Sequence, residues 1–271
     1  MPTVQVDGVR VWCATGGTEW KKGNPFLLFV HGAGNHHAVW ALQARSLAQH
    51  GWNVVAPDLP GHGQSDDLPE IGSIDDYVAW LTRLFKALEL DGAAVVGHSM
   101  GACIALSFAT AHPEETTALV LLGAGEAMPV NDRLLDDTLH QPLDAHRFIT
   151  AFGHGRAAHF GGSEAPGIWL LGNARALLEQ CRPAVLHRDF AACNDWSAAG
   201  KIDCEALVIS GAADRMTPAK GGRALARKLD ARFELVPDCG HMIMAESPGR
   251  VTRILRSFLD PLRESSRRSL E

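Results

Sequence analysis

The chain has 271 residues, of which 46% are hydrophobic and 21% are charged, and its formal net charge is −6. This composition is typical of a soluble globular protein, and a negative charge without a long basic run argues against nucleic acid or an anionic membrane as the main partner. The N-terminus lacks the pattern of a signal peptide, no apolar run is long enough to span a bilayer, and six scattered cysteines form no C-x-x-C pair, so we expect a cytoplasmic protein with free thiols.

The first residues predict a β-hairpin, because 3–6 and 9–12 alternate in hydrophobicity around the turn Asp7-Gly8. Continuous apolar runs follow, and such runs are typical of strands buried on both faces of a parallel sheet. These runs are 26–30, 53–58, 93–96, 118–123, 206–211 and 232–236. Helices are expected at 39–50, 74–88, 102–109, 219–229 and 251–259. Strands alternating with helices predict the α/β class, with a mostly parallel, doubly wound sheet and an antiparallel edge formed by the hairpin.

The helix expected after Ser73 has a recognisable start. Ser73 is followed three residues later by Asp76, a pattern that resembles a capping box. Apolar side chains recur behind it at helical spacing, and we interpret this stripe as core rather than as a ligand site. The stripe comprises Tyr77, Trp80, Leu81, Leu84, Phe85 and Leu88.

The stretch 126–202 interrupts the alternation of strands and helices. It has no continuous apolar strand but contains short amphipathic pieces, the turn Gly161-Gly162 and many aromatic residues. We interpret it as a helical cap inserted into a core formed by 1–125 and 203–265. Sites in open α/β sheets lie at the carboxyl ends of the strands, so we expect the cap to cover that edge.

A nucleophilic serine is predicted by the sequence Gly97-His98-Ser99-Met100-Gly101. The run 93–96 before it predicts a strand and the run 102–109 after it predicts a helix, which is the context of a nucleophile elbow. The sharp turn requires small flanking residues, and it leaves the central serine exposed at a helix N-terminus. That helix end offers free N–H groups and a partial positive charge, which suit a developing oxyanion.

A serine hydroxyl needs a base, and the base needs a group that orients it. Among 13 histidines, His241 is selected by its position just after the last strand, and Asp214 follows the preceding strand. All three candidates follow strand ends, and their order, Ser, Asp, His, is that of the α/β-hydrolase fold. Glu126 also follows a strand and is the alternative acid, although Asp214 fits better.

Acyl transfer also requires hydrogen-bond donors for the tetrahedral oxyanion. One is expected to be the backbone N–H of Met100, the residue after the nucleophile. The second should come from the loop after the strand 26–30, which reads His31-Gly32-Ala33-Gly34. We nominate the N–H of Ala33, with that of Gly34 as the reserve.

These segments together resemble the α/β-hydrolase superfamily. The matching pieces, in family order, are HGAG at 31–34, DLPGHGQSD at 58–66, GHSMG at 97–101, GAADRMTP at 211–218 and CGHM at 239–242. They are most similar to small capped esterases, carbon–carbon bond hydrolases and cofactor-free haloperoxidase-like enzymes. The resemblance implies hydrolysis through an acyl-enzyme, with Ser99 as nucleophile, His241 as base and then acid, and Asp214 holding the tautomer. A serine at the elbow argues against dehalogenases and epoxide hydrolases, which use a carboxylate there.

The expected activity is therefore cofactor-free hydrolysis of an ester, or a related acyl bond, of a small molecule. Cleavage of a carbon–carbon bond in a dienoate-type product is the alternative within the same fold, and a ligand receptor that kept the triad is a third hypothesis. His154 and His159 lack the spacing of a zinc site with a third ligand, so we expect no metal. The candidate lining residues of the substrate pocket are Gly32, Gly34, His36, His98, Phe148, Phe152 and Trp169.

Overall fold

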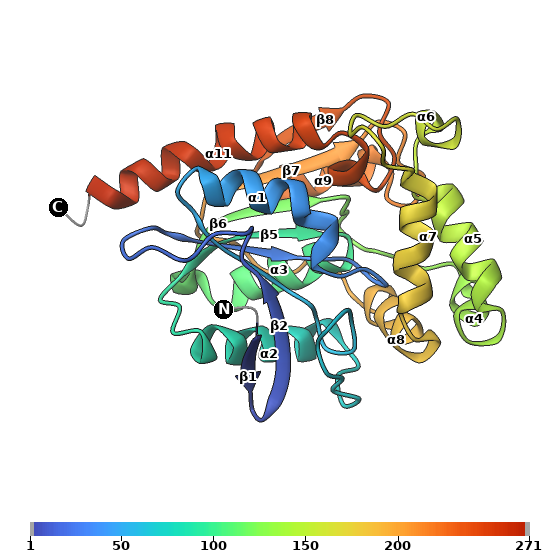
Figure 1. Cartoon of the computed structure of the whole chain (residues 1–271), viewed down its shortest axis with the longest axis horizontal. Helices are drawn as coiled ribbons and strands as arrows, with labels where there is room; N and C mark the ends of the chain where they lie inside the picture. Colours follow the sequence, from blue (N-terminus) through green and yellow to red (C-terminus); the bar gives the residue numbers. More distant parts are fainter. Residues whose placement is uncertain (1–2, 269–271) are drawn as a thin grey trace.

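The structure is a computed structural model that describes residues 3–268, and its centre is one eight-stranded sheet (Figure 1). The strand order is β1-β2-β4-β3-β5-β6-β7-β8. The first two strands pair antiparallel, β2 also pairs antiparallel with β4, and every later pairing is parallel. The predicted class and the antiparallel edge are confirmed. The strands are β1 (Thr3–Val6), β2 (Val9–Ala14), β3 (Phe26–Val30), β4 (Asn53–Pro57), β5 (Ala93–His98), β6 (Thr116–Leu122), β7 (Ala206–Gly211) and β8 (Arg232–Val236).

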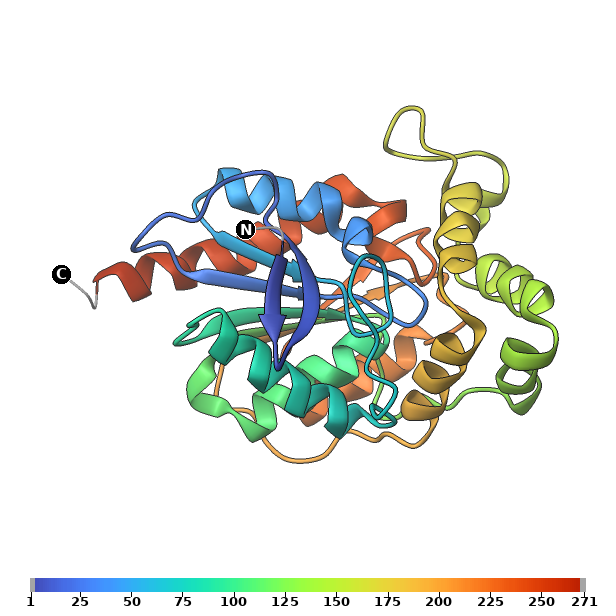
Figure 2. The ribbon, with the colours of Figure 1, turned by 60° about the horizontal axis from the view of Figure 1, so that its bottom comes forward.

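Helices cover both faces of the sheet, as a doubly wound fold requires. One face packs against α1 and α11, and the opposite face packs against α2, α3 and α9 (Figure 2). The central strands β3 to β7 are almost wholly buried because they are covered on both sides, which explains their continuous apolar sequences. These helices are α1 (Ala41–Gln49), α2 (Ile74–Ala87), α3 (Met100–Ala111), α9 (Ala219–Lys228) and α11 (Pro248–Arg268).

Three expected helices begin at least two residues earlier than predicted, and one of them is α3, which begins at Met100 rather than at residue 102. The first begins as the 3-10 helix η1 (His37–Trp40), because the His36 side chain accepts a hydrogen bond from the Ala38 N–H and starts the turn early. The last begins at Pro248 rather than at residue 251, and a proline at the first helical position loses no backbone hydrogen bond. Short elements complete this part of the chain, namely η2 (Pro113–Glu115) and α10 (Ile243–Glu246).

The predicted capping box at the start of α2 is confirmed. The Ser73 hydroxyl accepts a hydrogen bond from the Asp76 N–H at 3.1 Å, and the Asp76 carboxylate accepts one from the Ser73 N–H at 3.0 Å. The apolar stripe behind the cap is buried against the sheet, so the cap fixes the start of a core helix.

Replacing Ser73 with alanine is expected to lower the free energy of unfolding by about 1 kcal/mol, since one N–H at the helix start loses its acceptor. Urea unfolding followed by circular dichroism measures this change. Ser257→Ala, at an exposed position within α11, is the matched control and should stay within about 0.5 kcal/mol of the wild type. Equal stability of the two variants would contradict the prediction.

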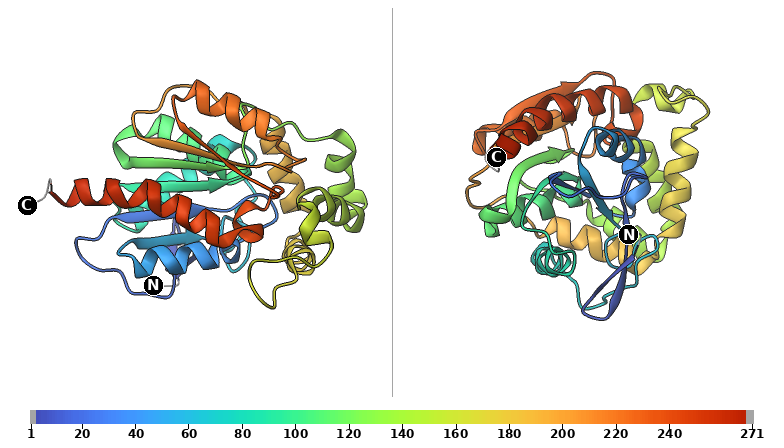
Figure 3. Two further views of the ribbon diagram at one scale, coloured as in Figure 1. Left: turned by 90° about the horizontal axis from the view of Figure 1, so that it is seen from above. Right: turned by 60° about the vertical axis from the view of Figure 1, so that its left-hand side comes forward.

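Five helices lie between β6 and β7 in the sequence and form what we call the helical insertion, residues 126–202. They are α4 (Asp132–His140), α5 (Pro142–Phe152), α6 (Arg156–His159), α7 (Leu170–Gln180) and α8 (Pro183–Asn194). The insertion lies at one end of the sheet (Figure 3, left). Its α4 and α8 pack on a small apolar cluster of their own, which includes Leu134, Leu186 and Phe190. No helix within residues 3–268 combines the length and the apolarity needed to cross a bilayer.

Candidate active site

Ser99 occupies a strained turn between β5 and α3. Its backbone has φ 54° and ψ −120°, a conformation that is rare for a residue with a side chain. The flanking glycines allow this turn because there is no room for a Cβ. A Cβ on Gly97 would collide with the carbonyl oxygen of Gly101, and one on Gly101 would collide with that of Val30. The G-x-S-x-G spacing thus follows from close backbone packing around one serine.

His241 and Asp214 follow neighbouring strands and are hydrogen-bonded to each other. The distance from His241 Nδ1 to Asp214 Oδ2 is 2.9 Å, and both side chains are buried. Because an ionised carboxylate can only accept, the Nδ1 atom carries the proton and Nε2 is left as the basic nitrogen. Burial raises the pKa of Asp214, but the hydrogen bonds and charge of its partners outweigh burial and hold that pKa below its ordinary value.

Thr217 is a functional residue that our sequence analysis missed. Its hydroxyl donates to Asp214 Oδ2 at 2.7 Å and also lies 3.0 Å from His241 Nδ1. The N–H groups of Met216 and Thr217 donate to Asp214 Oδ1 at 2.9 and 2.8 Å. These donors orient the carboxylate toward the imidazole. These donors could have been found from the sequence, because Met216 and Thr217 lie two and three residues after Asp214, where a turn can direct their N–H groups to its carboxylate.

Two cavities meet at Ser99 and His241, which line both of them. The larger has a volume of about 440 Å³ and mainly apolar walls, to which α8 contributes Phe190 and Cys193. The smaller has a volume of about 40 Å³. The serine and the histidine therefore face the same space at the carboxyl edge of the sheet, between the sheet and the helical insertion. The polar residues that line the smaller cavity include Asn35, His98, Thr150 and His154.

Of the two residues nominated as oxyanion donors, one lines this space and the other directly follows Ser99. Within the described chain, neither the N–H of Ala33 nor that of Met100 has a backbone or side-chain acceptor. Ala33 lines the smaller cavity together with Ser99. The reserve donor is engaged elsewhere, because the N–H of Gly34 points to Asp189 Oδ2 at 3.4 Å. Gly32 lies against Ser99, since a Cβ built on it would be 3.0 Å from the Cβ of Ser99.

His98 directly precedes Ser99 in the sequence and is buried. Its Nε2 atom lies 3.0 Å from the carbonyl oxygen of His241, and the two rings are 4.7 Å apart. Burial lowers the pKa of His98 to about 3, so the ring is neutral. A neutral ring that donates from Nε2 fixes the backbone of His241 without adding charge to the site.

The structure corrects the other candidates for the pocket wall. Phe148, Phe152 and Trp169 line neither cavity and have exposed fractions of 38, 36 and 68%. Phe148 and Phe152 stack on each other with ring centroids 4.3 Å apart, and Arg215 covers the second ring. His36 also lies outside both cavities and caps η1. Gly34 also lines neither cavity, and it packs against Leu178 of α7 and Leu186 of α8.

Glu126, the alternative acid, is exposed, and its backbone carbonyl pairs with the N–H of Ala198. A group of three potential metal ligands occurs elsewhere in the described chain, where His36, His37 and Asp58 bring ligand atoms within 4.8 Å of one another. Both oxygens of Asp58 already accept hydrogen bonds, one from His37 Nδ1 at 2.7 Å and the other from the Gln64 N–H at 2.9 Å. This carboxylate therefore serves to hold its loop.

A buried polar network beside the site was also missed by our sequence analysis. His62 Nε2 lies 2.8 Å from Asp189 Oδ2, and neither side chain is exposed. Burial lowers the pKa of His62, but the charge and the hydrogen bond of Asp189 outweigh burial and raise that pKa to about 10. The reciprocal interaction with His62 holds the pKa of Asp189 below its ordinary value against the effect of burial.

This pair should make stability depend on pH. The pKa of His62 is raised in the folded state from an ordinary value of about 6.5. The stability it contributes is therefore complete below about pH 6.5 and decreases as the pH rises toward 10. We expect the free-energy difference between the wild type and His62→Gln, measured by urea unfolding, to shrink between pH 6.5 and 9.5. A constant difference over this range would contradict a charged His62.

Comparison with known proteins agrees with the fold. Residues 27–254 match the profile of the alpha/beta hydrolase family. A pimeloyl-[acyl-carrier protein] methyl ester esterase from Aromatoleum aromaticum is 33% identical over 246 residues, which cover 83% of this chain and 94% of that protein. A solved thermophilic esterase is similar with a TM-score of 0.80 and 27% identity, covering 96% of this chain and 97% of the other.

The enol-lactonase of Burkholderia xenovorans LB400 has the same fold, with a TM-score of 0.85 and 20% identity over 96% of this chain and all of the other. The family profile extends over most of the chain, and the relative from Aromatoleum aromaticum is aligned over nearly its whole length. These similarities support a hydrolase that acts on small molecules. The chain therefore belongs to the alpha/beta hydrolase family.

Proposed function

We propose that this protein is a serine hydrolase that cleaves a carboxylic ester, or a related acyl bond, of a small molecule. The observation that carries the proposal is one arrangement of three residues. Ser99 stands on a strained turn and faces the same cavities as His241, whose Nδ1 is bound to the buried Asp214. This is the arrangement of nucleophile, base and orienting acid that acyl transfer uses.

In the proposed mechanism, Ser99 Oγ attacks the ester carbonyl carbon while its proton moves to His241 Nε2. The new C–O bond forms as the carbonyl π bond opens, and the negative charge moves to the carbonyl oxygen. When this intermediate collapses, the alcohol leaves with the proton from His241 and an acyl-serine remains. Water then repeats the sequence, which releases the acid and restores the serine. Asp214 stays ionised and stabilises the imidazolium in both halves.

The oxyanion would be held by the N–H groups of Ala33 and Met100. Both donors lack an acceptor within the described chain, and Met100 begins α3, where the helix dipole favours negative charge. No cofactor or metal takes part in this mechanism, since the side chains and water supply every proton.

We propose further that residues 126–202 form a cap over a hydrolase core of 1–125 and 203–265. The larger cavity is lined by residues that follow the sheet strands and by Phe190 and Cys193 of α8. Because its walls are mainly apolar, it suits the apolar part of an acyl group or alcohol. The methyl ester esterase among the relatives is consistent with an ester substrate.

A fluorophosphonate probe with mass mapping, beside a panel of p-nitrophenyl esters of increasing acyl length, tests this function. We expect labelling at Ser99 and ester turnover, and the length profile should report the size of the larger cavity. Labelling without turnover of any ester, but with cleavage of a dienoate-type diketo acid, would favour carbon–carbon bond hydrolysis. Absence of labelling together with tight ligand binding would favour a receptor and contradict the proposal.

A further inference from the structure

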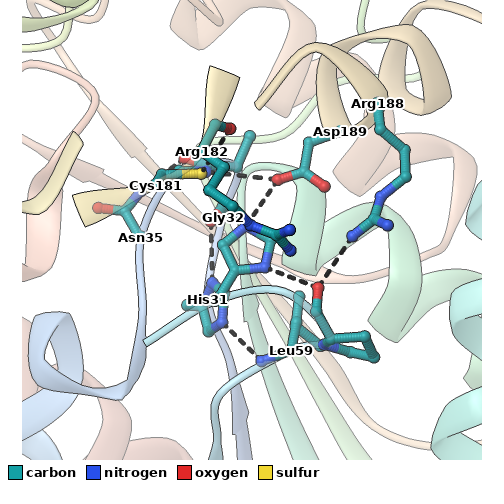
Figure 4. A network of polar contacts seen from close by, with 12 residues as sticks. His31, Gly32, Asn35, Leu59, Cys181, Arg182, Arg188 and Asp189 are labelled. Atoms are coloured by element: carbon teal, nitrogen blue, oxygen red, sulfur yellow. Dashed lines mark hydrogen bonds and ion pairs between the residues drawn. The ribbon is translucent and has the colours of Figure 1, made fainter. Parts of the chain in front are cut away.

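Asp189, on α8 of the helical insertion, is a fully buried carboxylate whose two oxygens have different partners. Oδ1 accepts a hydrogen bond from the Tyr77 hydroxyl at 2.6 Å. Oδ2 accepts one from His62 Nε2 at 2.8 Å and a longer one from the N–H of Gly34 at 3.4 Å. The carboxylate thus connects the insertion to α2, to the loop after β4, and to the loop after β3 (Figure 4).

The hydrogen-bond geometry makes His62 a cation. Its Nε2 atom faces the Asp189 carboxylate, and its Nδ1 atom lies 3.2 Å from the carbonyl oxygen of Pro60. Both partners can only accept, so both ring nitrogens must carry a proton. Asp189 and His62 therefore form a buried ion pair between the insertion and the core. If one member is removed, the other becomes an uncompensated buried charge.

The same carboxylate reaches the loop that carries Ala33. Gly34 follows Ala33 directly, and a Cβ built on Gly34 would lie 2.8 Å from Leu178 Cδ2 and 2.9 Å from Leu186 Cδ1. These leucines belong to α7 and α8. The insertion therefore packs tightly on this loop and also binds its backbone through Asp189. The position of the Ala33 N–H depends on contacts from outside the sheet.

We propose that Asp189 is a positioning residue for acyl transfer, which holds the Ala33 N–H in place through its bonds to His62 and to the N–H of Gly34. This inference rests on the proposed function. Asp189 lines neither cavity, so it acts through the loop rather than on substrate. Its neighbour in sequence, Phe190, forms part of both cavity walls, so the same anchor also fixes a wall of the site.

The test is Asp189→Asn, which keeps the shape of the side chain but removes the charge that His62 and the Gly34 N–H require. We expect kcat for a short p-nitrophenyl ester to fall roughly 10- to 100-fold, the range expected for a displaced oxyanion donor, while KM changes less than about threefold. Asp189→Ala, which removes both oxygens, should lower kcat further.

A second readout separates positioning from loss of structure. A trifluoromethyl ketone binds by forming a bond from Ser99 Oγ to its carbonyl carbon, with the proton passing to His241 and the charge to the ketone oxygen. Its affinity should fall in Asp189→Asn by the same factor as kcat/KM, because that oxygen uses the same donors. The affinity for the matching methyl ketone, measured as competitive inhibition, should change less than about threefold.

Tyr77→Phe is the matched control, because it removes the partner of Oδ1 and leaves His62 and Gly34 on Oδ2. It removes one hydrogen bond but leaves the ion pair intact, so it should lower the melting temperature by less than Asp189→Asn does and keep kcat within about threefold of the wild type. Full kcat in folded Asp189→Asn, or an equal loss of kcat in Tyr77→Phe, would overturn the inference while the proposed function stands. A wild type that neither turns over esters nor binds the trifluoromethyl ketone would overturn both.

Discussion

Ser99→Ala is expected to lower kcat for ester hydrolysis by roughly 10⁶-fold, the loss that follows removal of a catalytic serine in a triad enzyme. Alanine removes the Oγ atom that forms the acyl bond but preserves the turn between β5 and α3. The variant should therefore keep the melting temperature of the wild type within a few degrees. Stopped-flow assays measure the fast ester turnover of the wild type. Long-time assays on the variant measure its residual turnover above the uncatalysed background.

Ser257→Ala is the control, because Ser257 is exposed on α11 and lines neither cavity; this variant should retain full activity. The fluorophosphonate probe should label this control and the wild type but leave Ser99→Ala unlabelled. Ester turnover in Ser99→Ala within tenfold of the wild type would show that another group is the nucleophile.

Asp214→Asn is expected to lower kcat roughly 10⁴-fold, as observed when the orienting carboxylate of a triad becomes an amide. The amide cannot stabilise the imidazolium by charge, and its NH₂ group can face His241 Nδ1 and favour the wrong tautomer. The Met216 and Thr217 N–H groups would still hold the remaining oxygen, so the loop should keep its shape. Steady-state kinetics at pH 8 measures the loss.

Two further variants show whether the loss is specific to Asp214. Asp203→Asn, an exposed carboxylate before β7, should behave like the wild type. Glu126→Gln tests the alternative acid and should also retain full activity, because Glu126 is exposed and forms no hydrogen bond or ion pair with His241. Loss of activity in Glu126→Gln together with an active Asp214→Asn would reverse the assignment of the acid.

The sheet could be predicted from the sequence because its strands carry local signals. The runs 206–211 and 232–236 coincide with β7 and β8, and β1 and β2 form the predicted hairpin around the turn Asp7-Gly8. The elbow was equally readable from its G-x-S-x-G spacing, although the backbone that excludes a Cβ at Gly101 belongs to Val30, on another strand. For the strands and the hairpin, neighbours along the chain determine the structure.

The pocket walls and the buried ion pair could not be predicted in this way. Asp189 and His62 are 127 positions apart, and nothing local distinguishes either one from an exposed loop or helix residue. Phe148 and Trp169 are aromatic residues in the right segment, yet the insertion leaves them exposed. Which aromatic side chain lines the cavity beside Ser99 depends on how the five helices of the insertion pack. In the structure this side chain is Phe190.

The place of the helical insertion in the chain has a consequence for how this scaffold can diversify. The strands that flank it, β6 and β7, are hydrogen-bonded neighbours, so the insertion begins and ends at neighbouring positions in the sheet. Recombination once after β6 and once before β7 would exchange the whole helical insertion, including the cavity wall formed by α8. Ser99, Asp214 and His241 would stay with the recipient protein. An exchanged insertion must bring its own carboxylate in place of Asp189, because His62 and Tyr77 remain in the recipient protein. Without that carboxylate, both buried side chains would lose their hydrogen-bond acceptor.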